Sequence, residues 1–132
     1  MTIRANLTNT HQVRTKTPDG KDLVFLTGTA IADYAGTMSD FIRDDLAIHL
    51  SPPNGPIWSN IDQCAPVVAL AALWHGRAVN VGWAVDWTEW TTYTWPGQPG
   101  PHVLLDSGIA VSGTDSVLIR VSYQATVLGT LG

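Results

Sequence analysis

Apolar and polar residues alternate through the middle of the chain in the pattern that β-strands require. Over one stretch every second position is a valine or a tryptophan, at Val79, Val81, Trp83, Val85 and Trp87. Because successive side chains of a strand point to opposite faces, this alternation predicts a strand over residues 78–87 that buries its apolar face in a core. A second apolar segment, residues 66–74, precedes it across a short link that contains glycine, which predicts a hairpin.

Other segments share this β-rich composition and are separated by turn residues. Strands are expected at residues 22–32, 46–50, 90–95, 103–111 and 117–128. Two segments rich in proline and glycine, residues 51–56 and 96–101, are expected to be loops, because proline has no amide hydrogen for a ladder. The pattern predicts an all-β fold of about seven or eight strands. An antiparallel, jelly-roll-like β-sandwich is the expected architecture, and a closed barrel is the alternative.

Two segments depart from the β pattern. Residues 37–40 place hydroxyl and acidic side chains before an apolar stretch, which predicts one short helix near residues 39–46. Residues 1–22 are polar and rich in threonine and asparagine, so they are expected to form an extended N-terminal arm that ends in a Pro-Asp-Gly turn. The chain would then consist of this arm and one β-sandwich domain, residues 23–132.

The composition supports one folded domain and narrows the choice of partners. The 132 residues are 45% hydrophobic and 14% charged, enough for one core without disulfides or metals. Seven basic and eleven acidic residues give a net charge of −4, which argues against a nucleic-acid binder. No apolar run reaches the roughly 18 residues of a membrane-spanning helix, and the N-terminus lacks the apolar core of a secretory signal. The chain is therefore expected to be cytoplasmic as synthesised.

Charge is distributed unevenly between the arm and the remainder. The arm carries two aspartates and four basic residues, a net charge of +2, and the basic residues are Arg4, Arg14, Lys16 and Lys21. Residues 23–132 hold nine acids, three arginines and no lysine, a net charge of −6. A sheet edge without lysine is prone to pair with another chain. These two features predict assembly, with the arm of one subunit lying on its neighbour.

Aromatic residues are concentrated between positions 74 and 95. Trp83 and Trp87 alternate with valine and are expected in the core. Trp90, Tyr93 and Trp95 lie beside threonines and a Pro/Gly loop, where exposed rings together with Glu89 would suit a sugar, a bilayer surface or a protein partner. Loop residue Trp58 is a further candidate for ligand binding or an interface.

No combination of nucleophile, base and metal ligands stands out in the sequence. Cys64 has no basic neighbour that would activate it, so a partly buried, unreactive thiol is expected. Asp86 and Glu89 are expected at the surface rather than as a glycosidase pair. The histidines lack the spacing of metal ligands, at His11, His49, His75 and His102. We therefore expect no enzymatic activity, no metal and no cofactor.

The sequence favours a non-enzymatic structural protein that assembles through its arm and its sheet edges. Capsid, decoration and tail proteins of viruses and phages often combine a small β-sandwich with an extended terminal arm, so a place in a virion is part of this hypothesis. Two alternatives use the aromatic residues instead. One is a lectin-like carbohydrate-binding module, and the other is a lipid-binding or pore-forming β-sandwich.

Overall fold

The structure is a computed structural model that describes the backbone of residues 2–38, 42–75, 82–112 and 114–132. It describes the side chains of residues 3–32, 44–71, 84–110 and 120–132. All regular secondary structure in these residues is β-strand, and they contain no helix. There are eight: β1 (Thr2–Arg4), β2 (Asn6–Lys16), β3 (Asp22–Met38), β4 (Ile42–Leu50), β5 (Trp58–His75), β6 (Gly82–Tyr93), β7 (His102–Ser112) and β8 (Thr114–Leu131). The all-β prediction is confirmed.

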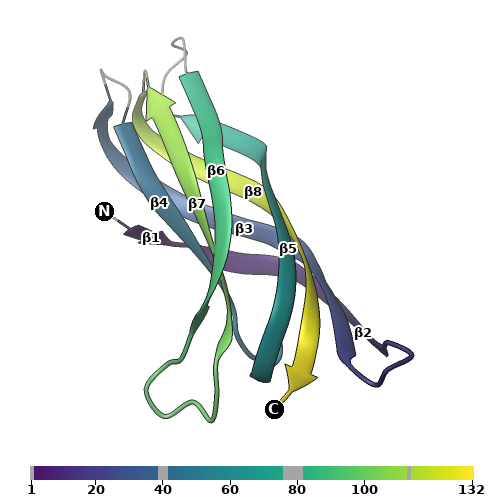
Figure 1. Ribbon diagram of the computed structural model, residues 1–132. Helices are drawn as coiled ribbons and strands as arrows, with labels where there is room; N and C mark the ends of the chain where they lie inside the picture. The colour runs from purple at the N-terminus through teal and green to yellow at the C-terminus, as the bar shows by residue number, and fades with distance from the viewer. Residues whose placement is uncertain (1, 39–41, 76–81, 113) are drawn as a thin grey trace.

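The strands form two four-stranded sheets that lie as two layers (Figure 1). Sheet A has the order β1-β4-β7-β6, and sheet B has the order β2-β3-β8-β5. All neighbours are antiparallel except β1 and β4, which are parallel. This arrangement is sandwich-like, as the spacing of turns in the sequence predicts. The predicted hairpin of residues 66–74 with 78–87 is wrong, because β5 pairs with β8 in sheet B and β6 pairs with β7 in sheet A.

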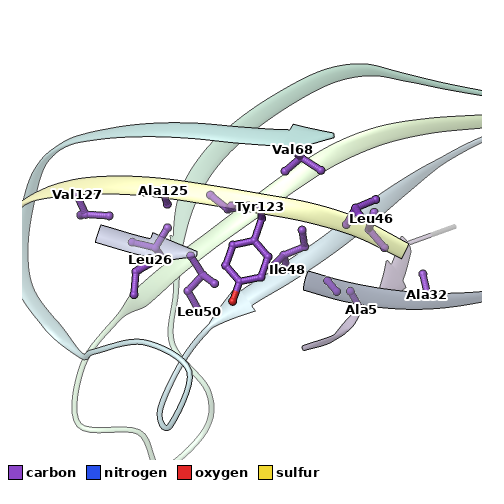
Figure 2. Close-up of a cluster of buried hydrophobic side chains, with 14 of the residues drawn as sticks. Ala5, Leu26, Ala32, Leu46, Ile48, Leu50, Val68, Tyr123, Ala125 and Val127 are labelled. Carbon is purple, nitrogen blue, oxygen red and sulfur yellow. The ribbon is translucent and has the colours of Figure 1, made fainter. Parts of the chain in front are cut away.

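The core lies between the sheets and is built from every second residue of the central strands. Sheet A contributes Leu46, Ile48, Leu50, Val103, Leu105 and Ile109, and sheet B contributes Val24, Leu26, Ala30, Val121, Tyr123 and Val127, all at most 3% exposed. The ring of Tyr123 extends from β8 into the space between the sheets, near Ile48 and Leu50 (Figure 2). Burying one such Val, Leu or Ile side chain stabilises the fold by about 1.5–3 kcal/mol.

The short helix predicted near residues 39–46 is wrong in the part that the structure describes, since Ile42–Leu50 is strand β4. Residues 39–41 lie outside the described part. Leu46, Ile48 and Leu50 are all fully buried and alternate with less buried residues. A helix would point these three side chains in different directions, whereas a strand places all of them on the core side. Burial of this face outweighs the local helix-start signal.

Strand β6 also differs from the prediction, because it runs without interruption from Gly82 to Tyr93 instead of ending before a separate strand at residues 90–95. A bulge between Val85 and Trp87 shifts the register against β7. An extra residue in a bulge changes which side chains face inward beyond it. The core position predicted for Trp87 is therefore wrong, and this side chain is 39% exposed. The side chain of Trp83 lies outside the described residues.

The N-terminal segment takes part in both sheets. Thr2–Arg4 pairs with β4, the amide of buried Ala5 donates to the carbonyl of Ala47 at 3.0 Å, and Asn6–Lys16 pairs with β3. The segment expected to form an arm thus supplies an outer strand of each sheet within its own chain. Its contact with a neighbouring subunit stays a prediction.

Packing of Tyr123 requires a glycine at position 28, which leads to a test of the core. A Cβ at Gly28 would lie 2.6 Å from Oη and 2.9 Å from Cζ of Tyr123. Gly28→Ala should therefore lower the free energy of unfolding in urea by about 1–3 kcal/mol, as other overpacked cores do. Thr126→Ala, an exposed position of β8, should cost about 0.5 kcal/mol or less. Equal effects of the two substitutions would contradict this packing.

Candidate functional site

Four rings gather on the outer face of sheet A. One of them belongs to the loop of residues 94–101, which joins β6 to β7 (Figure 1). We call His49, Tyr93, Trp95 and His102 the ring cluster. Tyr93 is the direct partner of His102 across β6 and β7, and His49 is paired with Leu104 across β4 and β7. Strand pairing therefore brings together side chains from β4, β6 and β7 that are distant in the sequence.

A chain of hydrogen bonds links the two histidines to the loop. His102 Nδ1 lies 2.9 Å from Gln98 Oε1, and His102 Nε2 lies 2.8 Å from His49 Nδ1. Gln98 Oε1 also accepts from the backbone amide of Trp95 at 3.2 Å, which identifies it as the amide oxygen. An amide oxygen can only accept, so His102 Nδ1 donates to it. When both imidazoles are neutral, as their lowered pKa values favour, His102 Nε2 accepts from His49 Nδ1.

Burial maintains this neutral state. His102 is fully buried, and burial is the main cause that lowers its pKa, with a smaller contribution from the positive charge of Arg4. The pKa of His49 falls from 6.5 to about 4, again mainly through burial and then through His102 and Arg4. The groups that surround the pair are thus Arg4 from β1, Tyr93 from β6 and Gln98 from the loop.

Three side chains of the same chain are in contact with the indole ring of Trp95. The imidazole of His49 lies 4.3 Å from it between ring centroids with a 34° tilt, and Tyr93 meets it edge-on at 4.7 Å. The guanidinium carbon of Arg4 lies 4.6 Å from the indole centroid, a cation–π contact. These contacts attach the loop to sheet A and leave little free ring surface on Trp95 for a ligand.

The residues proposed from the sequence as a binding site are distributed over different parts of the fold. Tyr93 and Trp95 meet in the ring cluster, where Tyr93 is 41% exposed. Trp90 is half-buried against the core, and Trp58 is 1% exposed. Glu89 is exposed on β6. Sequence reasoning weighed His49 and His102 only as metal ligands and Arg4 only as part of the arm. It did not predict that the three meet, because strand register brings them together and spacing along the chain does not reveal it.

Acidic side chains form a second group on the outer face of sheet A. Glu89 and Asp106 are directly paired across β6 and β7. Burial raises the pKa of Asp106, and the negative charges of Asp45 and Glu89 raise it further. Its Oδ1 is buried and has no hydrogen-bond partner in the described part of the chain. The described residues contain no group of three or more side chains arranged to hold a metal ion.

The basic residues of the N-terminal segment have contacts within their own chain. Lys16 Nζ lies 3.0 Å from Asp22 Oδ1, and Lys21 Nζ lies 2.6 Å from Asp62 Oδ2. Arg14 Nε donates to Gln12 Oε1 at 3.1 Å, and Arg4 lies over Trp95. Lys16 is still 69% exposed, so its ion pair is a weak surface contact.

The remaining residues noted for their chemistry are dispersed. Cys64 is half-buried, and burial raises its pKa to about 11, so its thiol is protonated at neutral pH. His11 is exposed on β2 of sheet B, whereas the ring cluster lies on sheet A. The side chain of His75 lies outside the described residues.

The outer face of sheet B carries three of the five large hydrophobic side chains that are exposed in the described residues. Val13 is 61% exposed, Phe25 40% and Val67 55%. They belong to the first two of three successive rows of paired residues. We call these three rows the neutral face, because none of their members is Asp, Glu, Lys or Arg. The rows are Val13–Phe25–Thr126–Ala65, His11–Thr27–Gln124–Val67 and Thr8–Thr29–Ser122–Ala69.

A shallow hollow interrupts the neutral face. It has a volume of about 260 Å³ and lies next to Phe25 in the register of β3 and β8. The residues that line it are Thr27, Gly28, Val67, Ser122, Tyr123 and Gln124. The neutral face therefore has a projecting aromatic ring beside a depression.

The outer strands of both sheets carry features that protect their edges. Strand β5 has three register shifts and contains Pro66, and β2 has a shift between Thr8 and His11. Strand β6 has its bulge between Val85 and Trp87, and β1 has only three residues. Bulges, proline and short length all hinder pairing with another chain. The edges are thus less open to a new strand than the sequence suggests.

Comparison with known proteins does not assign this chain to a family, since no family model, curated protein or solved structure matches it. The described residues form no helix with the length and apolar character needed to cross a bilayer.

The lowered pKa of His49 predicts that acid destabilises the fold. As pH falls from 6.5 to about 4, the unfolded chain binds a proton at this residue and the folded chain does not, so stability declines over this window and is constant above it. The melting temperature should therefore fall between pH 7 and pH 4.5. His49→Asn keeps a donor near Nδ1 and removes the titration, so its melting curve should depend less on pH. His11→Gln is the exposed control, and identical pH profiles for all three proteins would refute this role of the histidine pair.

The raised pKa of Asp106 predicts that its charge destabilises the folded state at neutral pH. A carboxyl with a raised pKa prefers to be protonated when folded, so the stability it contributes is lost as pH rises through that pKa. Asp106→Asn should therefore raise the melting temperature at pH 7 and have little effect near pH 3. Asp19→Asn is the control, because hydrogen bonding to Thr17 lowers the pKa of that exposed carboxyl. A lower melting temperature for Asp106→Asn at pH 7 would disprove the prediction.

Proposed function

We propose that the protein is a non-enzymatic structural protein that associates with further copies of itself. The observation that carries this proposal is the neutral face, where Val13, Phe25 and Val67 are exposed on one side of sheet B. Apolar surface of this kind is favourable to bury and often marks an interface. A homo-oligomer or larger assembly would cover it.

The structure directs this proposal away from the sheet edges and the charges of the N-terminal segment. Register shifts and Pro66 interrupt the longer outer strands, as described above. Lys16 and Lys21 have aspartate partners in their own chain, and Arg4 contacts Trp95. The neutral face of sheet B, with its exposed Val13, Phe25 and Val67, is therefore the better-supported surface for association.

The two alternative functions have less support from the described residues. A lectin platform needs an accessible ring, and Trp95 is already in contact with His49, Tyr93 and Arg4. Binding to an anionic bilayer favours Trp and Tyr together with basic residues, and the neutral face contains none of these. Exposed Tyr93 and Trp87 remain the residues through which a carbohydrate would act.

We propose that the protein belongs to the class of capsid, decoration or tail components of a virus or phage. This assignment is an analogy at the level of fold, because small β-sandwiches recur in such particles. A structural role is consistent with the neutral face, where Val13, Phe25 and Val67 are exposed.

Sedimentation of the unmodified chain tests self-association. We expect a species larger than a monomer whose fraction grows with protein concentration. Because the proposed contact is apolar, raising NaCl should leave association unchanged or strengthen it, whereas contact through the basic N-terminal residues would weaken as salt screens charge. A monomer at every concentration would refute the proposed function, and glycan-array and liposome binding would then test the two alternatives.

A further inference from the structure

We propose that two copies of the chain pack face to face through their neutral faces, with Phe25 of each copy inserted into the hollow of the other. This inference rests on the proposed function, since it specifies the partner and the contact for self-association. A two-fold arrangement requires a surface that is complementary to itself. The shape, area and charge of this one face therefore determine whether two copies can pair through it.

The shape of the face suits such a pairing. Phe25 projects from β3 and is 40% exposed, and the hollow begins one row away, at Thr27 and Gln124. A two-fold axis between the ring and the hollow would place each Phe25 over the hollow of the opposite copy. The hollow measures about 260 Å³. Cavities of about 150 Å³ in protein cores accommodate benzene, so there is room for a phenyl ring.

The neutral face and the rows that flank it are together large enough for a small dimer interface. The three rows span residues 25–29 of β3, about 17 Å by about 19 Å, or roughly 320 Å² per copy. With the flanking rows, over residues 22–31 of β3 and their partners, the contact covers roughly 600 Å² per copy. Two copies would then bury about 1,200 Å² in this extended contact, the lower end of the range for specific interfaces. Arg120, paired with Ile31 next to the third row, would supply part of a polar rim, which is typical of such contacts.

The distribution of charge favours a second copy as the occupant. The protein carries a net charge of −4, and Asp45, Glu89 and Asp106 interact on the outer face of sheet A. Contact through sheet A would bring these like charges together, which opposes association. Contact through the neutral face places the two acidic faces on opposite outer sides of the dimer. The neutral face also has no basic residue that would attract nucleic acid or an anionic membrane.

Charge variants at Val67 test whether the neutral face meets its own copy. Val67 is 55% exposed, so Val67→Lys and Val67→Asp should fold normally, which circular dichroism checks. Each variant alone should dimerise at least about tenfold more weakly, because like charges would oppose each other across the two-fold contact. A mixture of the two should form a heterodimer, detected by native mass spectrometry. Thr91→Lys and Thr91→Asp, exposed on β6 of sheet A, are the matched controls and should dimerise like the unmodified chain.

The outcomes separate this inference from the proposed function. If both Val67 variants associate like the unmodified chain, another surface holds the assembly and the face-to-face contact is refuted, while self-association stands. If both variants are monomers and their mixture is too, the neutral face meets a different surface, and the two-fold arrangement is refuted. If the unmodified chain is itself a monomer, the proposed function and this inference both fail.

A substitution at Phe25 tests the insertion into the hollow. Phe25→Ala should raise the dimer dissociation constant by roughly 30-fold, the effect of removing an aromatic residue that anchors an interface. Thr91→Ala should have no effect on it. An unchanged dissociation constant for Phe25→Ala would refute the insertion of the ring.

Discussion

Burial of one side of each sheet against the other is the interaction on which the remaining features depend. Ile48 of β4 and Leu105 of β7 are direct partners in sheet A, and Leu26 and Ala125 are direct partners in sheet B, all at most 1% exposed. A shift of one residue in either register would turn these side chains to the solvent. The burial of the inner faces therefore fixes which residues are presented on the two outer faces.

The bulge in β6 shows how a small change in register distributes the aromatic residues. Before it, Val85 packs against the core, and after it Trp90 does so, while Trp87 between them lies outside. The alternation of side chains after the bulge also places Glu89 and Tyr93 on the outer face of sheet A. The contributions of β6 to the ring cluster and to the acidic group, Tyr93 and Glu89, thus both depend on one extra residue in an outer strand.

The two outer faces have different chemistry for the same reason. Sheet A presents imidazoles, aromatic rings and carboxylates, and hydrogen bonds and ring contacts satisfy much of that surface within the chain. Sheet B presents threonine, serine, alanine and exposed apolar residues without acids or lysines in its three central rows. A face without acidic or strongly basic side chains is the one through which association has the smaller desolvation cost.

The sequence by itself determined the all-β class, most strand positions and the single core, because alternation with a period of two is a local property of the chain. It did not determine the conformation of Ile42–Leu50, where a helix-start signal competed with alternation and burial against β7 and sheet B decided the outcome. The tertiary structure alone brought His49 and His102 within hydrogen-bond distance and turned Trp87 outward. These outcomes depend on strand order and on a bulge between distant segments, and no local pattern of residues encodes either one.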